Sequence, residues 1–322
     1  MQRRHFLGSG LGLAATHIST RAWAQNFPNK PIKLIVPAIA GSAVDVLARS
    51  IAERLTAGLG QSVVIDNKPG AASNIGLEAI AKAAPDGYTI GLGTSAMASN
   101  PYLYSKVPYD PVNDFTPVNL MFAMPHALIV KADSPLNSVA DLLRMLKAGP
   151  GKYNYASGGN GSGAHLCAEL FKSMSATDVV HVPYRGAPEI VTAVIGGSVL
   201  FGFPTLATAV PLVKSGKLRA IGVTGPKRNP ALADVPSVSE TIAGFEIVSW
   251  FAIVAPAKVP LDLVRSIDME IQKALSDQAF RDRIVADGTE IVGIGHQEFP
   301  ARLRSDLQKF KKVVELSGAK VD

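Results

Sequence analysis

The chain has 322 residues, of which 47% are hydrophobic and 18% charged, and its formal net charge is +6. The positive charges are spread along the chain, and the one dense patch, Lys309–Lys312, lies in an amphipathic pattern, which argues against a nucleic-acid-binding protein. The single cysteine, Cys167, excludes an intrachain disulfide, and no later segment has the roughly 18 uninterrupted apolar residues of a membrane span.

The N-terminus has the features of an export signal. An arginine pair at residues 3–4 precedes an apolar pair at 6–7, a short apolar run follows, and Ala22 and Ala24 form a small-x-small cleavage pattern. We interpret residues 1–24 as a cleaved, twin-arginine-like export signal. Its three arginines leave with it, so the formal charge falls from +6 to +3, and the mature protein is expected to be soluble in the periplasm.

Strand and helix patterns alternate after the signal. Strands are predicted at 32–36, 63–65 and 88–92, with helices at 44–59 and 75–84 between them. This βαβαβ order implies a parallel sheet covered by helices on both faces. A proline-rich connector is expected from 100 to 117, before a strand at 127–130.

A second alternating series completes the chain. It contains predicted helices at 139–146, 188–195 and 300–316 and strands at 218–223 and 247–254. We therefore predict an α/β fold of two lobes, each a mostly parallel sheet flanked by helices. The expected division is 25–131 plus 240–322 for lobe 1 and 132–239 for lobe 2, with the chain crossing near Lys131 and Glu240.

The most informative segment is the glycine-rich loop Ser157–Gly163. It follows a strand that ends at Tyr155 and precedes a helix in which Leu166, Leu170 and Met174 recur every four residues. Glycine leaves the backbone N–H groups at the helix start unobstructed, and the positive end of the helix dipole adds to them. The sequence therefore predicts an anion-binding site at this loop.

Other loops also follow predicted strands, where ligands of open α/β sheets bind. The loop 37–45 leads into the first helix, and its Ser42 suits either a helix N-cap or a ligand donor. The loop 93–96 is small and carries hydroxyl groups. In the loop 182–186, Arg185 is suited to hold a carboxylate, although an exposed or ion-paired arginine fits the same pattern.

Sequence blocks that carry a family resemblance occur along nearly the whole chain: Pro31–Pro37 with Asp45 and Arg49, Asp66–Ala71, Ala84–Thr89, Lys152–Tyr155, His181–Gly186 and Asp234–Pro236. In this order they resemble the extracytoplasmic receptors of tripartite tricarboxylate transporters, the Bug family. The resemblance implies a two-lobed periplasmic binding protein (type II-like, Venus flytrap) that closes on a small carboxylate. A dicarboxylate or an aromatic acid is expected, together with delivery to the membrane permease subunits of the transporter.

The resemblance and the loops together give a set of candidate ligand-binding residues: Ile39, Ala40, Gly41, Ser42, Asp45, Thr94, Ser95, Ala96, Ser157, Gly159, Asn160, Gly161, Ser162, His165, Tyr184, Arg185, Gly186 and Thr205. His165 is expected to be a neutral hydrogen-bond donor or a helix-start side chain rather than a general base, because no carboxylate lies near it in sequence. We expect a monomer with no catalytic residue, metal or cofactor.

The chain departs from the family pattern in two places. Ala38 and the pair 41–42 stand where the family usually has an aromatic residue and two glycines, and 203–205 reads Phe-Pro-Thr where an Asp or Asn pair is frequent. We expect the lost carboxylate to disfavour an amino-acid ligand and the small Ala38 to leave room for a larger or aromatic acid.

Two alternative readings remain open. Gly159–Ala164 matches G-x-G-x-x-A after a strand, which would suit an exported α/β enzyme or a nucleotide-binding protein, but no acidic residue follows about 20 positions later. No serine has the G-x-S-x-G elbow, and metal-ligand spacings are absent from the sequence. A ligand sensor that contacts the ectodomain of a two-component kinase would use the same capture chemistry.

Overall fold

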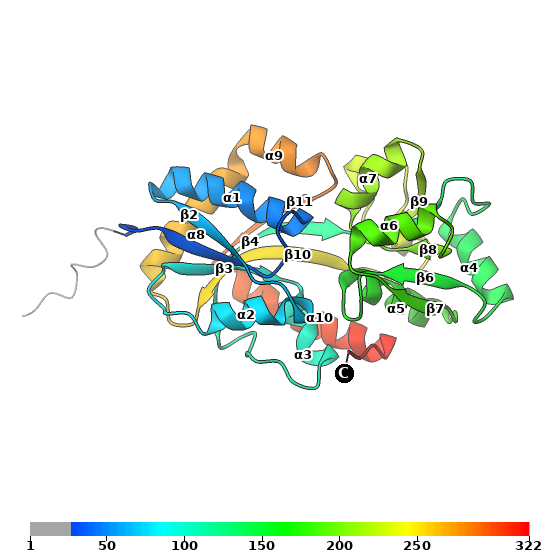
Figure 1. The fold of residues 1–322 in the computed structure, drawn as a ribbon, viewed down its shortest axis with the longest axis horizontal. Helices are drawn as coiled ribbons and strands as arrows, with labels where there is room; N and C mark the ends of the chain where they lie inside the picture. Colours follow the sequence, from blue (N-terminus) through cyan, green and yellow to red (C-terminus); the bar gives the residue numbers. More distant parts are fainter. Residues whose placement is uncertain (1–26, 322) are drawn as a thin grey trace, which may run out of the picture.

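A computed structural model describes residues 27–321 and arranges them in two lobes, each built on one sheet (Figure 1). The larger sheet has six strands in the order β11-β4-β10-β3-β1-β2. Their bounds are β1 Ile32–Val36, β2 Val63–Asn67, β3 Thr89–Thr94, β4 Phe115–Pro125, β10 Val248–Pro256 and β11 Glu290–Gly295. The sheet is parallel only among β1, β2 and β3, because β10, β4 and β11 pair antiparallel.

Helices cover both faces of this sheet (Figure 1). They are α1 Ala43–Leu59, α8 Leu261–Ser276 and α9 Gln278–Val285 on one face, and α2 Asn74–Ala81, α3 Ala96–Leu103 and α10 Phe299–Ser317 on the other. Side chains alternate along β1, so Leu34 packs in the cluster with α1 and α8, whereas Ile35 packs with α2. Because both faces are buried, β1 reads as an almost continuous apolar run.

The smaller sheet has five strands in the order β7-β6-β8-β5-β9. Its strands are β5 Ala127–Lys131, β6 Asn154–Ser157, β7 Val180–Pro183, β8 Phe201–Gly202 and β9 Leu218–Val223. Its helices are α4 Val139–Ala148, α5 Gly163–Ser175, α6 Ala187–Ile195 and α7 Leu206–Lys214. Short 3-10 turns are η2 Ala71–Ser73, η3 Pro230–Leu232 and η4 Val238–Glu240.

Three expectations need correction. The sheets are mixed rather than mostly parallel. The strand β5 does not belong to the first lobe, because it pairs with β8 and β9 in the smaller sheet, so the chain crosses at Pro125–His126 and not near Lys131. The expected connector 100–117 contains the end of α3 and the start of β4, whose residues from Val118 to Phe122 are fully buried.

The chain leaves the larger lobe at Pro125–His126 and returns to it at Ile247–Val248, not near Glu240, and Thr224, the residue after β9, is hydrogen-bonded to both crossings. The Ile247 N–H donates to the Thr224 carbonyl at 3.1 Å. The backbone N–H of His126 donates to Oγ1 of Thr224 at 2.8 Å, and the Thr224 N–H donates to the His126 carbonyl at 2.9 Å. The helix α10 adds a third connection, because Ser173 Oγ on α5 donates to the Leu316 carbonyl at 2.7 Å and the Val321 N–H donates to the Leu103 carbonyl at 3.1 Å. The C-terminal helix α10 and the residues after it therefore contact both lobes (Figure 1).

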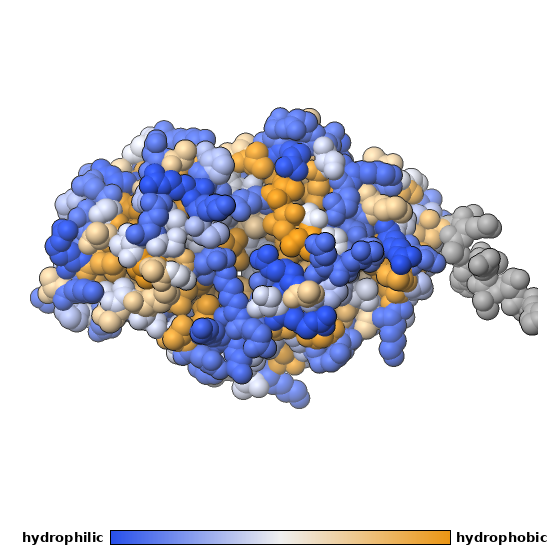
Figure 2. Space-filling model, turned by 180° about the vertical axis from the view of Figure 1, so that it is seen from behind, coloured by the Kyte–Doolittle hydropathy of each residue, from blue (hydrophilic) through white to orange (hydrophobic). Residues whose placement is uncertain are grey.

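The face turned away from this view is mostly hydrophilic, with a strip of hydrophobic residues down its middle (Figure 2). Among the described residues, no helix combines the length and the apolar character that a bilayer span requires. The export signal predicted for residues 1–24 lies outside the described residues.

Candidate functional site

A cavity of about 440 Å³ lies between the two lobes, a size typical of small-molecule sites. From the larger lobe it is lined by Pro37, Ala38, Val44, Ala72, Ser73, Thr94, Ser95, Ala96 and Ser99. From the smaller lobe it is lined by Gly158, Asn160, Gly161, Ser162, Gly163, Leu166 and Arg185, and from β10, the segment before it, and α10 by Ile247, Ser249, Phe251 and Phe310. None of these lining residues is acidic.

The glycine-rich loop brings the N-terminus of α5 to this cavity. Ser162 is the N-cap residue, and its Oγ accepts the backbone N–H of His165 at 3.2 Å. Gly159 and Gly161 turn the loop with φ angles of 102° and 76°, which other residues rarely adopt. The first N–H groups of α5, beginning at Gly163, have no carbonyl acceptor within the helix. The predicted anion-binding geometry is therefore present at the cavity wall.

Arg185 places a cation at the same wall. It lies between β7 and α6, its side chain is exposed, and its backbone N–H donates to Oε2 of Glu189 at 3.1 Å. Within the part of the chain that the structure describes, the guanidinium of Arg185 has no ion pair or hydrogen bond. Its charge and its planar set of donors are therefore available to a carboxylate.

The larger lobe contributes hydroxyl groups. Thr94 Oγ1 accepts the Ala96 N–H at 3.3 Å, and the Ser95 N–H donates to the Trp250 carbonyl at 3.1 Å. Among the described residues, the side-chain hydroxyls of Ser95, Ser99 and Ser249 have no hydrogen-bond partner, although all three line the cavity. These hydroxyls can donate to a ligand oxygen.

The backbone before α2 is strained where it reaches the cavity. Ala71, Ala72 and Ser73 have φ angles of 46°, 47° and 78°, a left-handed conformation that costs non-glycine residues about 1–2 kcal/mol each. The Asn100 side chain holds this turn, because its Nδ2 donates to the Ala72 carbonyl at 2.9 Å and to Asn74 Oδ1 at 2.8 Å. Strain of this kind is concentrated at binding sites.

The segment 37–45 brings different residues to the cavity from those predicted. Ile39 is 64% exposed, and Gly41 borders a separate cavity beside α1, α9 and α7. The main cavity is lined by none of the five predicted residues of this segment, which are Ile39, Ala40, Gly41, Ser42 and Asp45. Ser42 caps α1 instead, with its Oγ accepting the Asp45 N–H at 3.3 Å. Pro37, Ala38 and Val44 line the cavity in their place.

The side chain of Asp45 stabilises this loop through hydrogen bonds. Its buried carboxylate accepts hydrogen bonds from Gly41 N–H at 2.8 Å, Arg49 Nε at 2.8 Å and Asn67 Nδ2 at 2.9 Å. Burial raises the pKa of Asp45, but the hydrogen bonds from Arg49, Gly41 and Asn67 outweigh it, so the pKa lies below its ordinary value. The carboxylate is therefore ionised and fully occupied within the loop.

The structure brings only part of the predicted set to the cavity: Thr94, Ser95, Ala96, Asn160, Gly161, Ser162 and Arg185. It places the remaining smaller-lobe candidates behind or beside the wall: Ser157, Gly159, His165, Tyr184, Gly186 and Thr205. Thr205 precedes α7, with its Oγ1 2.9 Å from Thr208 Oγ1. His165 is buried, which lowers its pKa to about 4, and its Nδ1 accepts the Gly161 N–H at 3.2 Å. It is a neutral helix-start side chain that acts as an acceptor at this atom.

Sequence reasoning missed the apolar wall. Phe251 comes from the buried strand β10 and Phe310 from the amphipathic helix α10, and both patterns are equally typical of an ordinary core. No local signal distinguishes a side chain that packs on the core from one that borders a cavity. Only the path of α10 across both lobes brings Phe310 to the site.

Gly163 is expected to be intolerant of any side chain. A Cβ at this position would lie 2.8 Å from His126 Nε2 and 3.0 Å from Ser249 Oγ. We expect Gly163→Ala to lower the free energy of unfolding by about 1–3 kcal/mol, because overpacking displaces the crossing segment. Urea denaturation measures this. Gly225→Ala is the matched control, since its nearest atom would be at an ordinary 3.5 Å. Equal stability of the two variants would contradict the prediction.

Comparisons with known proteins agree with this architecture. A family model described as a tripartite tricarboxylate transporter family receptor matches residues 47–318. Protein BugT of Bordetella pertussis (strain Tohama I) is 31% identical over 315 residues, which cover 97% of this chain and 97% of that protein. The structure of R. palustris Rpa4515 with adipate has a TM-score of 0.85 and 34% identity, covering 92% of this chain and 100% of that chain.

A second solved structure with a bound acid is also similar. MatC (Rpa3494) from Rhodopseudomonas palustris with bound malate has a TM-score of 0.81 and 26% identity, covering 89% of this chain and 100% of that chain. The predicted α/β fold of two lobes is confirmed, and it is also the fold of the periplasmic binding protein BugD.

Proposed function

Because the chain belongs to the tripartite tricarboxylate transporter receptor family, we propose that it captures a small dicarboxylate or aromatic acid between its lobes in the periplasm and delivers it to the membrane permease subunits of such a transporter. The observation that carries the proposal is Arg185, whose guanidinium is unpaired among the described residues. It shares a cavity with the N-terminus of α5, and no lining residue is acidic. Both features favour an anion.

One carboxylate of the ligand binds at Arg185 and the loop of Ser162, and the rest of the ligand extends toward Ser95 and Ser249 on the other side of the cavity. Micromolar affinity requires about 8 kcal/mol, and charge-assisted hydrogen bonds contribute about 1.5–3 kcal/mol each. Four or five such bonds suffice after the ordering costs. A ligand that contacts both lobes stabilises the closed form, because only that form makes all of the contacts.

The apolar part of the wall defines the ligand class further. Phe251, Phe310 and Leu166 border the cavity, and Ala38 leaves space where a larger side chain would reduce it. A hydrocarbon chain or an aromatic ring can pack there, so adipate, the ligand in the structure of the R. palustris relative, is a reasonable probe. We accordingly expect acids with an apolar body to bind best.

Amino acids are expected to bind poorly. An ammonium group in this cavity would face Arg185 and the N-terminus of α5, with no lining carboxylate to compensate for its lost hydration. The sequence departure from the family pattern at 203–205 is not the reason for this weak binding, because Phe203 is buried in the core of the smaller lobe and Thr205 lies outside the cavity wall. The composition of the lining is the reason instead.

Thermal unfolding of the mature protein with a ligand panel tests the proposal. The panel holds adipate, malate, citrate, benzoate, aspartate and NAD at equal concentration and ionic strength, and calorimetry follows any hit. We expect adipate or benzoate to raise the melting temperature, since a ligand of the native state stabilises it. A rise with aspartate alone would refute the ligand class, and a rise with NAD alone would favour the nucleotide-binding alternative. Recovery of each acid chemically unchanged after incubation with the protein would agree with a receptor and not with an enzyme.

A further inference from the structure

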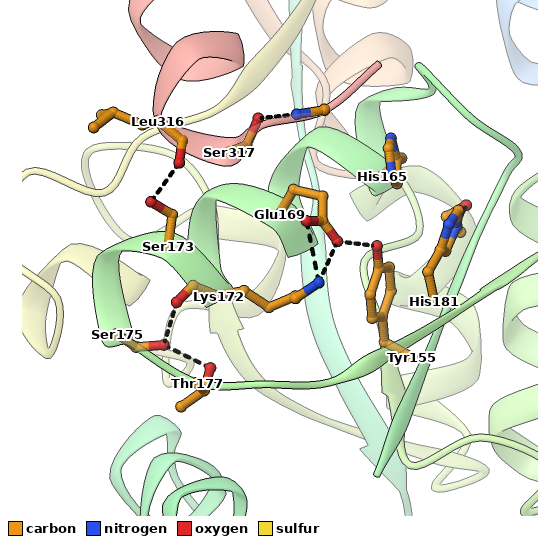
Figure 3. A network of polar contacts seen from close by, with 12 residues as sticks. Tyr155, His165, Glu169, Lys172, Ser173, Ser175, Thr177, His181, Leu316 and Ser317 are labelled. Atoms are coloured by element: carbon orange, nitrogen blue, oxygen red, sulfur yellow. Dashed lines mark hydrogen bonds and ion pairs between the residues drawn. The ribbon is translucent and has the colours of Figure 1, made fainter. Parts of the chain in front are cut away.

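Two histidines of the smaller lobe, His165 and His181, are stacked on each other (Figure 3). The ring of His181, on β7, lies 4.5 Å from the ring of His165, on α5, with an interplanar angle of 28°. On its other side it stacks on Tyr155, on β6, at 4.9 Å and 15°. Neither histidine lines the cavity. The pair instead connects the strands β6 and β7 of the smaller sheet to the glycine-rich loop, which does line the cavity.

Each imidazole holds a different point of the loop. Nδ1 of His165 accepts the backbone N–H of Gly161 at 3.2 Å. Nε2 of His181 lies 2.5 Å from Oγ of Ser157, and that oxygen accepts the backbone N–H of Gly159 at 3.1 Å. The two glycines occupy left-handed conformations that no regular ladder fixes. The Gly161 N–H is directed inward by His165 and the Gly159 N–H by Ser157, which His181 contacts, and this leaves the N–H groups at the start of α5 for a ligand.

We propose that the stacked pair of His165 and His181 positions the anion-binding loop, and that it does so only while His165 is neutral. The proposal deepens the proposed function and depends on it for the affinity measurement below. A protonated His165 would carry a hydrogen on Nδ1, which would oppose the Gly161 N–H instead of accepting it. Two stacked cations would also repel each other.

The surroundings of the pair favour the neutral form. Burial first, and then the neighbouring His181 ring, lowers the pKa of His165 to about 4, and burial also lowers the pKa of His181. Two charged groups face both rings: Glu169, which raises both pKa values, and Lys172, which lowers them. The two groups oppose each other and are themselves an ion pair, because Lys172 Nζ lies 2.8 Å from Glu169 Oε1, which also accepts the hydroxyl of Tyr155 (Figure 3).

The first test measures loop position without any ligand. Amide hydrogen exchange, followed by NMR, should become faster at Gly161 in His165→Ala and at Gly159 in His181→Ala, while amides of the larger sheet keep their protection. His165→Asn places a side-chain oxygen near the Nδ1 position, and His181→Gln places an amide near Nε2, so both should restore slow exchange. In the wild type, the Gly161 resonance should also titrate in acid, and in His165→Asn it should not.

The second test measures the consequence for binding, with adipate as the probe. We expect His165→Ala to weaken adipate binding about tenfold, since a buried donor loses its acceptor, and His165→Asn to regain most of the affinity. Tyr155→Phe is the matched control: it keeps the stacked ring and removes only the bond to Glu169, so adipate affinity should stay within twofold.

The outcomes separate the two proposals. Unchanged exchange at Gly161 and Gly159 in the alanine variants, or failure of Asn and Gln to restore it, would overturn the positioning role. If His165→Ala does not fold, the wild-type titration and the His165→Asn spectra still determine whether His165 positions the loop. If the wild-type protein does not bind adipate, the proposed ligand is wrong, while the exchange data still determine whether the histidines position the loop.

Discussion

Replacing Arg185 with alanine should weaken carboxylate binding by about tenfold to a hundredfold, because a charge-assisted hydrogen bond contributes about 1.5–3 kcal/mol. The guanidinium lines the cavity and has no partner among the described residues, so its removal takes away a ligand contact and no structural one. The free energy of unfolding should therefore change by less than about 0.5 kcal/mol. Calorimetry with adipate and urea denaturation measure the two effects.

A matched arginine of the same lobe serves as the control. The Arg144 side chain is 77% exposed, and its Nη1 lies 3.1 Å from Asp141 on the same helix, α4, away from the cavity. Arg144→Ala should leave adipate affinity unchanged. Arg185→Lys keeps the charge but not the planar pair of donors, so its affinity should be intermediate. If Arg185→Ala binds as tightly as the wild type, the carboxylate does not bind at this residue.

Features that depend on neighbouring residues could be predicted from the sequence. The strand 218–223 matches β9, and the predicted helix 300–316 differs from α10 by one residue at each end. The loop before α5 was also predictable, because an N-cap serine, flanking glycines and an apolar helical stripe are all local signals. The same reasoning placed Arg185 among the candidate residues, because it follows β7 at the carboxyl end of a parallel strand pair, and the structure places it on the cavity wall.

Features that depend on distant contacts could not be predicted. Asp45 had the sequence position of a ligand residue, but its carboxylate is occupied by Arg49 and by Asn67, which is 22 residues away. Nothing in the sequence Ala71–Ser73 signals three left-handed residues, because the turn is held by Asn100 from α3. The strand β5 joins the second sheet only because β8 and β9 return to pair with it.

Acid should destabilise the protein through its buried histidines at a higher pH than the one at which Asp45 becomes protonated. His126 lies at the crossing between the lobes, is 3% exposed, and has no partner for Nδ1 within the described residues, so burial lowers its pKa to about 4. His165 also has a pKa of about 4, and the pKa of His181 is lowered as well. The unfolded chain regains ordinary histidines with a pKa of about 6.5.

The sign follows from where the protons bind. Between about pH 6.5 and pH 4 these histidines are protonated in the unfolded state but remain neutral in the folded state. The free energy of unfolding therefore decreases as the pH is lowered. From pH 7 to pH 5 the loss is about 2 kcal/mol for each of His126 and His165, measured by urea denaturation at the two pH values. The pKa of Asp45 is lowered from an ordinary 3.8, so its contribution to stability is lost only below this pH range.

The variant His126→Gln removes one titrating group. It should lose about 2 kcal/mol less than the wild type between pH 7 and pH 5, even though its stability at pH 7 is lower. Equal losses in the two proteins would mean that water reaches His126 at the crossing and keeps its pKa near the ordinary value.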